Sequence, residues 1–322
     1  ESKNPWDIVL AIQPTGDPTL FHSDFSNHPV WDFLENHTKD IDRNNFAVLD
    51  TVWRDQRWGS GWSWTDYEAD YMAERNVMPI FGNIVDVKLN SPEHRDIENP
   101  ASPQLNKVKL FKTQHSLFDS LLNSETYLVS PDNLLSKSPG VQIRREIDNN
   151  KFWIEATPKR FSAIKIPFVT GNEYGFWTNS ASVTLKIIAD SLKCFFGTLR
   201  PRSGDTTFGF NCYDCGTRSL KIKNWYKIHS QPTDSLLKPM MHRSDNFFAE
   251  QSLLMVSNEK LGLMSDEKII DTLLKTDLKD LPQKPRWADG SGLSRYNLFT
   301  PQDFVTILNK MKNEFGMERL KV

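Results

Sequence analysis

The order of apolar and polar positions divides the chain into a strand-rich first part and a helical last part. Alternating or β-branched runs, separated by Gly, Asn and Pro, predict strands at 46–53, 151–157, 163–169, 181–188 and 218–225. From about residue 229 the apolar spacing becomes helical and predicts helices over 234–241, 246–256, 265–278 and 301–315. These patterns indicate a chain that combines helices with sheets.

Capping residues mark the starts of two of the predicted helices. Ser265 precedes two acids, and Thr300 precedes a proline with Asp303 three positions on, so both are good N-caps. The last predicted helix carries one apolar stripe and ends before Gly316; the stripe consists of Phe304, Ile307, Leu308, Met311 and Phe315. Because an amphipathic helix needs a partner, we expect this stripe to be exposed or covered by another chain.

A polar stretch with three prolines, at 91–104, indicates a domain boundary or a long loop. We therefore expect three regions. Residues 1–90 form an accessory domain with a Trp-rich loop, 91–228 an antiparallel β-rich accessory domain, and 229–322 a helical region. In the first region Trp58, Trp62 and Trp64 are expected to pack together as a small aromatic cluster.

Length and charge exclude several classes of protein. A chain of 322 residues has room for about two or three domains. Its 39 basic and 41 acidic residues give a net charge of −2, which offers no electrostatic reason to expect a nucleic-acid partner. No apolar run approaches the roughly 18 residues of a membrane-spanning helix, so no transmembrane segment is expected.

Cysteines and histidines give no sign of a metal or another cofactor. Three cysteines are too few for a disulfide scaffold or a Cys₄ zinc site. Cys212 and Cys215 have the Cys-x-x-Cys spacing without a second pair, which fits a hairpin turn or a local disulfide as well as a metal or redox site. The seven histidines are scattered, so we expect neither metal nor cofactor, and the role of the cysteine pair stays open.

A Ser-Asp-Asn triplet, at 244–246, lies between two predicted helices. The same triplet occurs in penicillin-binding proteins and class A β-lactamases. In such a loop Ser244 and Asn246 can face one cleft while Asp245 turns into the protein or caps the next helix. The Ser hydroxyl can then relay a proton to a leaving amine, and the Asn amide can hold the carbonyl of a peptide substrate.

Four further segments share a family's order of motifs with Ser-Asp-Asn. They are Gly16-Asp-Pro-Thr-Leu20, Gly59-Ser-Gly-Trp-Ser-Trp-Thr-Asp66, Asn83 with the strand after it, and Asp289-Gly-Ser-Gly-Leu-Ser-Arg295. With Ser-Asp-Asn they resemble the class C low-molecular-mass penicillin-binding proteins, the D-alanyl-D-alanine carboxypeptidase/endopeptidase family. The resemblance extends over residues 16–301, although 105–228 contributes little to it.

The resemblance implies a fold and a site. The fold is an α+β serine penicillin-binding domain, similar to β-lactamases and transpeptidases, interrupted by β-rich accessory domains. The implied site comprises Ser244 and Asn246 as catalytic residues and Asp66, Ser291, Leu293 and Arg295 as substrate-binding residues. In the family the Asp and Arg hold the ammonium and carboxylate of a diaminopimelyl side chain, which predicts that Asp66 and Arg295 lie near each other.

The chain departs from the family at two elements. No Lys-Thr-Gly occurs, and Ser-x-x-Lys occurs only where its order or geometry is wrong, beginning at Ser162, Ser235, Ser257 and Ser265. We therefore expect the central part of a longer chain, with only part of the transpeptidase domain, namely its helical part with Ser-Asp-Asn at 229–322. Alone, such a chain is expected to be inactive.

The expected parent is a bacterial serine-type D-Ala-D-Ala carboxypeptidase/endopeptidase of the periplasm or cell envelope. It would cleave peptidoglycan stem peptides through an acyl-enzyme and bind β-lactams, without cofactor. A catalytically inactive peptidoglycan-binding or scaffold homologue and a structural surface domain are the alternatives. The sequence does not separate carboxypeptidase from endopeptidase, and it leaves the oligomeric state open.

Overall fold

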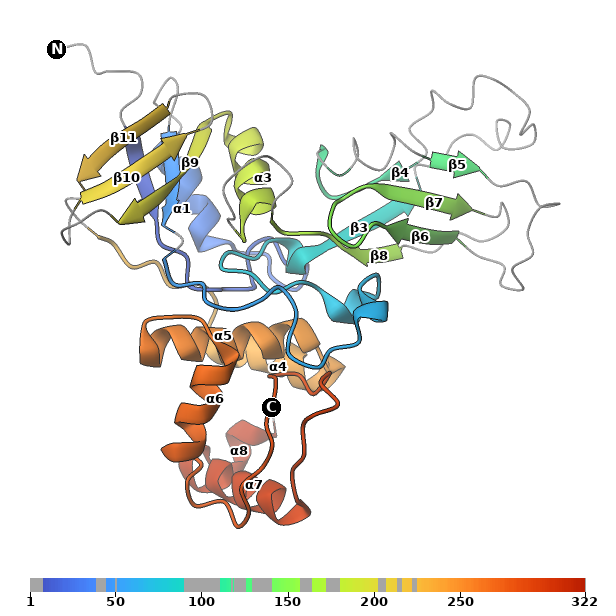
Figure 1. Cartoon of the computed structure of the whole chain (residues 1–322), viewed down its shortest axis with the longest axis vertical. Coiled ribbons are helices and arrows are strands. Elements are labelled where there is room, and N and C mark those ends of the chain that lie inside the picture. Colours follow the sequence, from blue (N-terminus) through green and yellow to red (C-terminus); the bar gives the residue numbers. More distant parts are fainter. Residues whose placement is uncertain are drawn as a thin grey trace.

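A computed structural model describes residues 8–38, 45–49, 51–89, 111–116, 118, 126–128, 141–156, 164–171, 180–201, 207–212, 216–221 and 225–321. Sheets occupy the upper part of the molecule in Figure 1, and the helices after residue 232 occupy the lower part. The predicted combination of helices and sheets is confirmed.

The largest sheet has five strands in the order β1-β2-β9-β10-β11. Its strands are β1 (Ile8–Ile12), β2 (Asn45–Leu49), β9 (Phe195–Pro201), β10 (Thr207–Cys212) and β11 (Gly216–Lys221). β2 pairs in parallel with both β1 and β9, while β10 is antiparallel to its two neighbours. The sheet thus takes strands from both predicted accessory regions, and the three-region division stays a prediction.

Two smaller sheets stand beside it, with strand orders β4-β3-β8 and β5-β7-β6. Their strands are β3 (Ile84–Leu89), β4 (Phe111–Lys112), β5 (Thr126–Leu128), β6 (Val141–Arg145), β7 (Phe152–Ala156) and β8 (Ile164–Pro167). The strands predicted at 151–157 and 163–169 are β7 and β8. The expectation of a purely antiparallel region is wrong, because β5 and β7 are parallel.

The strand predicted at 181–188 is wrong, since these residues begin helix α3 (Ser182–Leu192). The helix is buried on most of its surface, so its sequence is almost continuously apolar, as in a buried strand. Its hydroxyl groups are satisfied inside the protein, where Thr184 donates to the carbonyl of Met78 over 2.7 Å and Ser182 to that of Thr170 over 3.3 Å. Burial therefore outweighs the β-branched composition.

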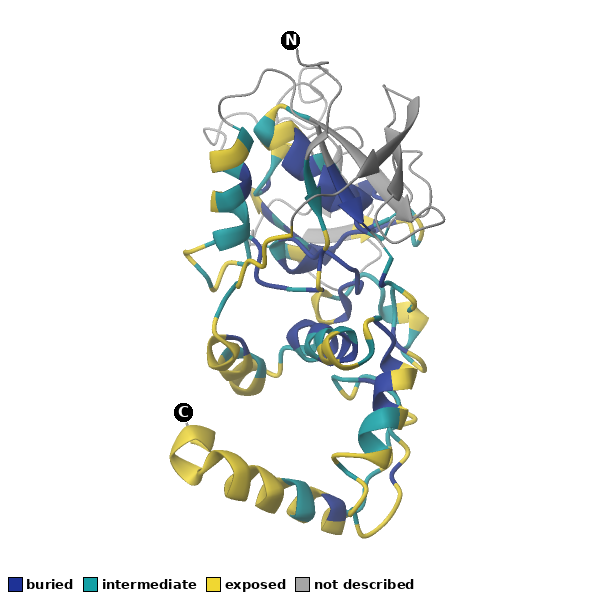
Figure 2. Cartoon of the chain, turned by 90° about the vertical axis from the view of Figure 1, so that its left-hand side faces the viewer, coloured by how far each residue is buried: buried dark blue, intermediate teal, exposed yellow. Residues whose placement is uncertain are grey.

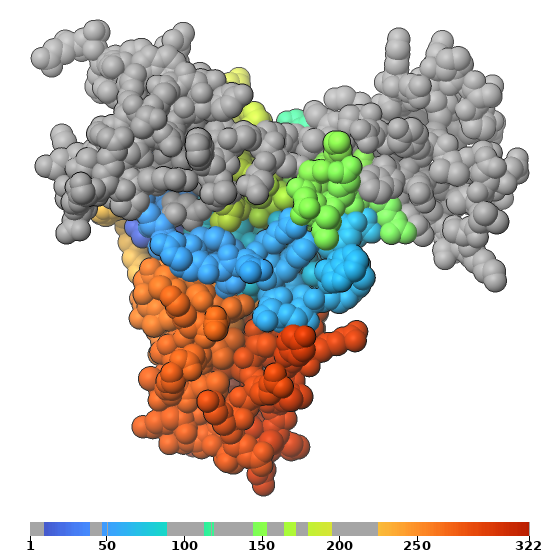
Figure 3. All heavy atoms as spheres, viewed as in Figure 1, coloured from blue at the N-terminus to red at the C-terminus, as the bar shows by residue number. Residues whose placement is uncertain are grey.

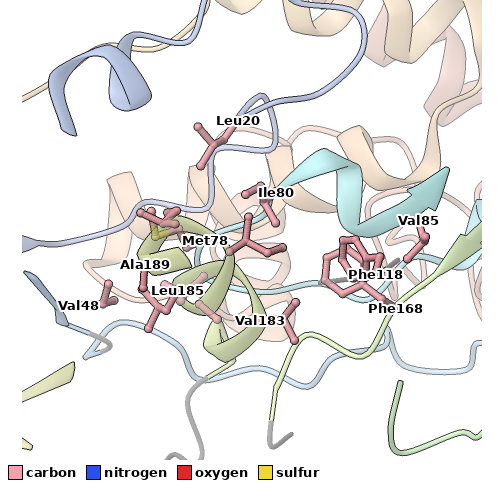
Figure 4. Packing of buried hydrophobic residues seen from close by; sticks show 14 of the residues in the cluster. Leu20, Val48, Met78, Ile80, Val85, Phe118, Phe168, Val183, Leu185 and Ala189 are labelled. Carbon is pink, nitrogen blue, oxygen red and sulfur yellow. The ribbon is translucent and has the colours of Figure 1, made fainter. Parts of the chain in front are cut away.

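The main hydrophobic core gathers around α3 (Figure 4). Its labelled members are Leu20, Val48, Met78, Ile80, Val85, Phe118, Phe168, Val183, Leu185 and Ala189. The segment 72–80 is buried along its whole length. This burial fixes its backbone, which leads from the Trp-rich loop into β3.

Five helices form the lower part: α4 (Thr233–Arg243), α5 (Asn246–Leu261), α6 (Asp266–Lys275), α7 (Pro301–Phe315) and α8 (Met317–Leu320). The predicted N-caps are confirmed, because Ser265 accepts from the backbone of Lys268, and Thr300 and Asp303 form a capping box. A further helix near the N-terminus is α1 (Pro29–Thr38). Among the described helices, none has the length and apolar character needed to cross a bilayer.

The apolar stripe of α7 is exposed, as predicted (Figure 2). Exposed fractions are 56% for Phe304, 60% for Leu308 and 45% for Phe315. Polar contacts connect the helix to the preceding segment, because Asp303 accepts from the backbone of Gln283 over 3.2 Å and Lys310 donates to the carbonyl of Asp277.

Candidate functional site

The Ser-Asp-Asn triplet forms the corner between α4 and α5. Ser244 ends α4 in the left-handed conformation, with φ 54° and ψ 51°, and it is exposed. Asp245 is the N-cap of α5, where its carboxylate accepts from the backbone of Phe248 over 3.0 Å. The middle residue therefore turns inward to cap the helix, and Ser244 and Asn246 flank it.

An ion pair holds this corner against the N-terminal segment. Arg243 donates through both terminal nitrogens to the carboxylate of Asp24, with Nη1 at 2.8 Å from Oδ1. The hydrogen bond from Arg243 lowers the pKa of Asp24 below its usual range. Next to Asp24, burial lowers the pKa of His22, whose ring packs against that of Phe248.

The Gly16 turn supports α5 from beneath. Gly16 has a φ of 83°, and an added Cβ would lie 3.1 Å from the Met264 side chain. The amide of Gln251 donates to the carbonyl oxygens of Gly16 and Asn76, each over 2.9 Å. Asn83, the other family-like residue of this part, is buried and donates to the carbonyl of Glu74 over 2.7 Å. Both positions are structural supports.

Asn246 and Asp66 both bind Tyr71, at different ends of the residue. The side-chain amide of Asn246 donates to the carbonyl of Tyr71 over 3.1 Å, across 175 residues of sequence. Asp66 ends the short helix η1 (Trp64–Asp66), and Tyr71 lies in η2 (Asp70–Met72). Burial and a hydrogen bond to Asp66 raise the pKa of the Tyr71 hydroxyl. Tyr71 thus connects Asn246, which binds its backbone carbonyl, with Asp66, which binds its side-chain hydroxyl.

The Trp-rich loop packs on the glycine-rich loop of residues 289–295. The indole of Trp62 donates to Asp289 over 3.0 Å. Gly61, at φ 78°, lies so close to Tyr296 that an added Cβ would be 2.5 Å from its ring. In Figure 3 the blue-to-cyan band lies directly against the orange and red part of the molecule. Two segments predicted to share a site are therefore in contact.

The predicted cluster of three tryptophans is wrong. Trp64 is 67% exposed, and the indole of Trp62 donates to Asp289. The guanidinium carbon of Arg57 lies over the Trp58 ring, 4.1 Å from the ring centre. The three indoles therefore lie in three different surroundings.

Asp289 organises the glycine-rich loop from inside. Its carboxylate accepts from the backbone of Gly292 over 2.8 Å and of Ser294 over 2.5 Å, and from the amide of Asn297 over 2.7 Å. Asp289 is only 2% exposed. Its role is to fix the loop that presents Ser291, Leu293 and Arg295.

The presented residues differ in exposure. Ser291 and Leu293 are half-buried, whereas Arg295 is exposed. No residue in the part of the chain that the structure describes forms an ion pair with Arg295. A guanidinium in this state can receive a carboxylate through two hydrogen bonds.

A buried ion cluster lies behind the loops. The guanidinium of Arg75 is surrounded by three carboxylates, with Asp266 at 2.8 Å, Asp55 at 3.0 Å and Glu250 at 3.1 Å. Glu250 also accepts from the backbone of Ser291 over 2.8 Å. Burial raises the pKa of Glu250 although Arg75 opposes the shift.

The sequence missed the residues that hold the site together. Tyr71 and Arg75 carry no local signal of a shared site, because their contacts join distant segments. Asp289 was predicted only as the first residue of the glycine-rich motif, without its contact to Trp62. One hint of the site was present in the sequence: Glu250 lies four positions after Asn246, on the same face of the predicted helix.

The described residues contain no group of His, Cys, Asp and Glu able to hold a metal ion. Cys212 ends β10 opposite Gly216, whereas Cys215 falls outside the described residues. The remaining cysteine, Cys194, is inert as a nucleophile because burial raises the pKa of its thiol to about 12.

Residues 221–319 match the model of the D-Ala-D-Ala carboxypeptidase 3 (S13) family. Penicillin-binding protein 4 (dacB) from Haemophilus influenzae has a similar structure, with a TM-score of 0.61 and 18% identity over 97% of this chain and 62% of that one. The same protein complexed with a novel β-lactam (CMV) gives a TM-score of 0.53 and 19% identity over 96% of this chain and 61% of that one. No curated protein matches the chain in sequence.

The chain spans about three fifths of the length of these solved structures, and their low identity makes the likeness one of fold. The family match lies in the helical part that carries Ser-Asp-Asn and the glycine-rich loop. The resemblance to the low-molecular-mass penicillin-binding proteins of the D-Ala-D-Ala carboxypeptidase family is therefore confirmed.

Proposed function

We propose that this chain carries the stem-peptide binding surface of a serine-type D-Ala-D-Ala carboxypeptidase/endopeptidase. The observation that supports it most is the convergence of three distant segments. Asn246 binds the carbonyl of Tyr71, Trp62 binds Asp289, and Ser291 binds Glu250, so the Trp-rich loop, the glycine-rich loop and the start of α5 adjoin.

Ser244 and Asn246 are proposed as the second catalytic element. Ser244 is exposed at the corner, and its hydroxyl has no hydrogen-bond partner among the described residues, which leaves it in a position to relay a proton to a leaving amine. Asn246 uses one amide hydrogen on Tyr71 and keeps the other for the carbonyl of the substrate. The nucleophilic serine and its lysine base belong, in this proposal, to the Ser-x-x-Lys element of the whole protein.

Substrate choice is assigned to the two loops. Arg295 is proposed to bind the carboxylate, and Asp66 the ammonium, at the far end of a diaminopimelyl side chain. Ser291 and Leu293, both half-buried, would form the wall of this pocket. Binding of β-lactams and a place in the bacterial periplasm or cell envelope follow from the same proposal.

Two measurements test the proposal. The chain should bind the tripeptide L-Ala-γ-D-Glu-meso-diaminopimelate in calorimetry, and it should bind the lysine analogue, which lacks the terminal carboxylate, at least about tenfold more weakly, a difference of about 1.4 kcal/mol. Equal affinities for the tripeptide and its lysine analogue would contradict the assignment of a carboxylate-binding pocket at Arg295. Labelling of the whole protein by a fluorescent penicillin separates the enzyme from an inactive peptidoglycan-binding homologue, which would bind the tripeptide without being labelled.

A further inference from the structure

We propose that Glu250 is a positioning residue that sets the glycine-rich loop against the Ser-Asp-Asn helix, and so sets the place of Arg295 relative to Asn246. The inference rests on the proposed function for its ligand. It assigns Glu250 no contact with that ligand, because the side chain is fully buried.

Glu250 lies one turn after Asn246 on α5 and uses both carboxylate oxygens. Oε1 accepts from the backbone of Ser291 over 2.8 Å, and Oε2 accepts from Nη1 of Arg75 over 3.1 Å. A residue of the helix that starts at Asn246 thereby fixes the loop that ends in Arg295. A single side chain connects the two proposed walls of the site.

Close packing at Gly290 supports the same arrangement. A Cβ at this position would lie 2.7 Å from the carbonyl oxygen of Ala249 and 3.2 Å from the Cα of Glu250. The backbone of the loop therefore rests directly on the backbone of α5. The close contact at Gly290 and the hydrogen bond from Ser291 to Glu250 together fix the distance between the loop and the helix.

Arg75 extends the connection to the third segment. Its Nη2 donates to the carbonyls of Gln56 and Trp58, each over 3.1 Å, at the start of the Trp-rich loop. Its guanidinium also lies 5.6 Å from the centre of the Trp62 ring. The path from the Trp-rich loop through Arg75 and Glu250 to Ser291 is continuous, and the Arg75 and Glu250 side chains at its centre are buried.

Replacement of Glu250 by Gln separates positioning from folding. Two donors converge on Glu250, whereas a Gln side chain offers one acceptor oxygen and a donor nitrogen. Because the hydrogen bond to the charged guanidinium is the stronger, we expect the Gln oxygen to face Arg75, so the contact with Ser291 is lost. Arg75 keeps Asp55 and Asp266, so no buried charge is left without a partner. The fold should survive while the loop loosens.

The experiment compares four chains of 322 residues: the unchanged chain, Glu250→Gln, Gly290→Ala and Asp303→Asn. Asp303 is a matched control, because it is a buried carboxylate of the same helical part that caps α7. Among the residues that the structure describes, its hydrogen-bond partners are Gln283 and Thr300, which lie outside the glycine-rich loop. The measurements are the affinity for the diaminopimelate tripeptide, its ratio to that for the lysine analogue, the melting temperature, and amide hydrogen exchange at 290–295.

The proposal expects Glu250→Gln to weaken tripeptide binding about tenfold or more, to lose most of the preference over the lysine analogue, and to speed exchange in the loop. Asp303→Asn should lower the melting temperature and keep both the affinity and the preference. Gly290→Ala, which pushes the loop off α5 without changing a charge, should reproduce the loss seen in Glu250→Gln.

Two results would overturn the proposal. One is unchanged exchange at 290–295 in Glu250→Gln. The other is an affinity loss in Asp303→Asn as large as that in Glu250→Gln, since the effect would then come from general destabilisation. If the unchanged chain does not bind the tripeptide, the proposed function fails, and exchange in the loop alone decides whether Glu250 positions it.

Discussion

The indole nitrogen of Trp62 donates to the buried carboxylate of Asp289 over 3.0 Å and joins two loops that are 227 residues apart in sequence. The same carboxylate fixes the backbone of Gly292 and Ser294 within its own loop. One side chain thus both shapes the glycine-rich loop and attaches it to the Trp-rich loop.

Asp289→Asn should destabilise the protein, because the amide nitrogen of Asn would face N–H groups that donate hydrogen bonds to the carboxylate of Asp289. Each buried donor left without a partner costs about 1–3 kcal/mol, and we expect a loss of free energy of unfolding in this range. Urea unfolding measures it. Asp280→Asn, at an exposed position of the same region, is the control and should change little. Equal effects in the two variants would contradict the central role of Asp289.

Arg295→Ala should impair recognition of substrate and leave the fold intact. In the whole enzyme we expect slower cleavage of stem peptides that contain diaminopimelate, because the carboxylate loses its two hydrogen bonds. Acylation by a small penicillin, which does not reach this residue, should stay nearly unchanged. Arg286→Ala, also at an exposed arginine near the loop, should alter neither rate. Equal losses on both substrates would indicate a folding defect instead.

Gly61→Ala should loosen the contact between the loops. The new methyl group would meet the ring of Tyr296 at 2.5 Å and would also impose the strain of a positive φ. Gly262→Ala is a matched control, because Gly262 has φ 68° but no atom within 4 Å of an added Cβ. The control isolates the strain, of about 1 kcal/mol, so an equal loss of stability in both variants would show that Gly61 is not packed tightly.

The ion pair between Asp24 and Arg243 should make stability depend on pH. The hydrogen bond from Arg243 lowers the pKa of Asp24 in the folded protein, so its contribution is complete above the unfolded pKa of about 4 and is lost as the pH falls through the folded value. Asp24→Asn should cost about 0.5–1 kcal/mol at pH 7, since the pair is partly exposed, and much less at pH 2–3.

Unfolding in urea at several pH values checks this dependence. In an Arg243→Ala background most of the effect of Asp24→Asn should disappear, and the remainder should come from His22, whose Nδ1 lies 3.5 Å from the Asp24 carboxylate. A cost of Asp24→Asn that is the same at every pH, or that persists undiminished without Arg243, would rule out the ion pair with Arg243 as its source.

The sequence predicted the features whose signals are local. The cap at Thr300, the stripe of α7 and the corner at Ser244 were found because capping and helical spacing act within a few residues. The strand predicted at 181–188 was wrong because a helix buried on nearly all sides loses the polar face that identifies it.

Long-range contacts were beyond the sequence alone. Nothing near Arg75 indicates that its partner is Glu250, 175 positions away, and nothing near Trp62 points to Asp289. Only the family's order of motifs suggested that the Trp-rich and glycine-rich loops adjoin. The family resemblance predicted the residues that would face a substrate, but it did not predict the buried residues that support them.

The corner at residues 244–246 restricts the sequence before any catalysis is required. Residue 244 has a left-handed backbone, which β-branched side chains resist, and residue 245 must offer a short acceptor to start α5. A library randomised at these positions and selected only for folding should therefore return Gly, Asn, Asp or Ser at 244 and Asp, Asn, Ser or Thr at 245. Folding alone would then restrict the residues allowed at positions 244 and 245 of the Ser-Asp-Asn signature. At position 246 we expect the largest difference between a library selected only for folding and one selected for activity.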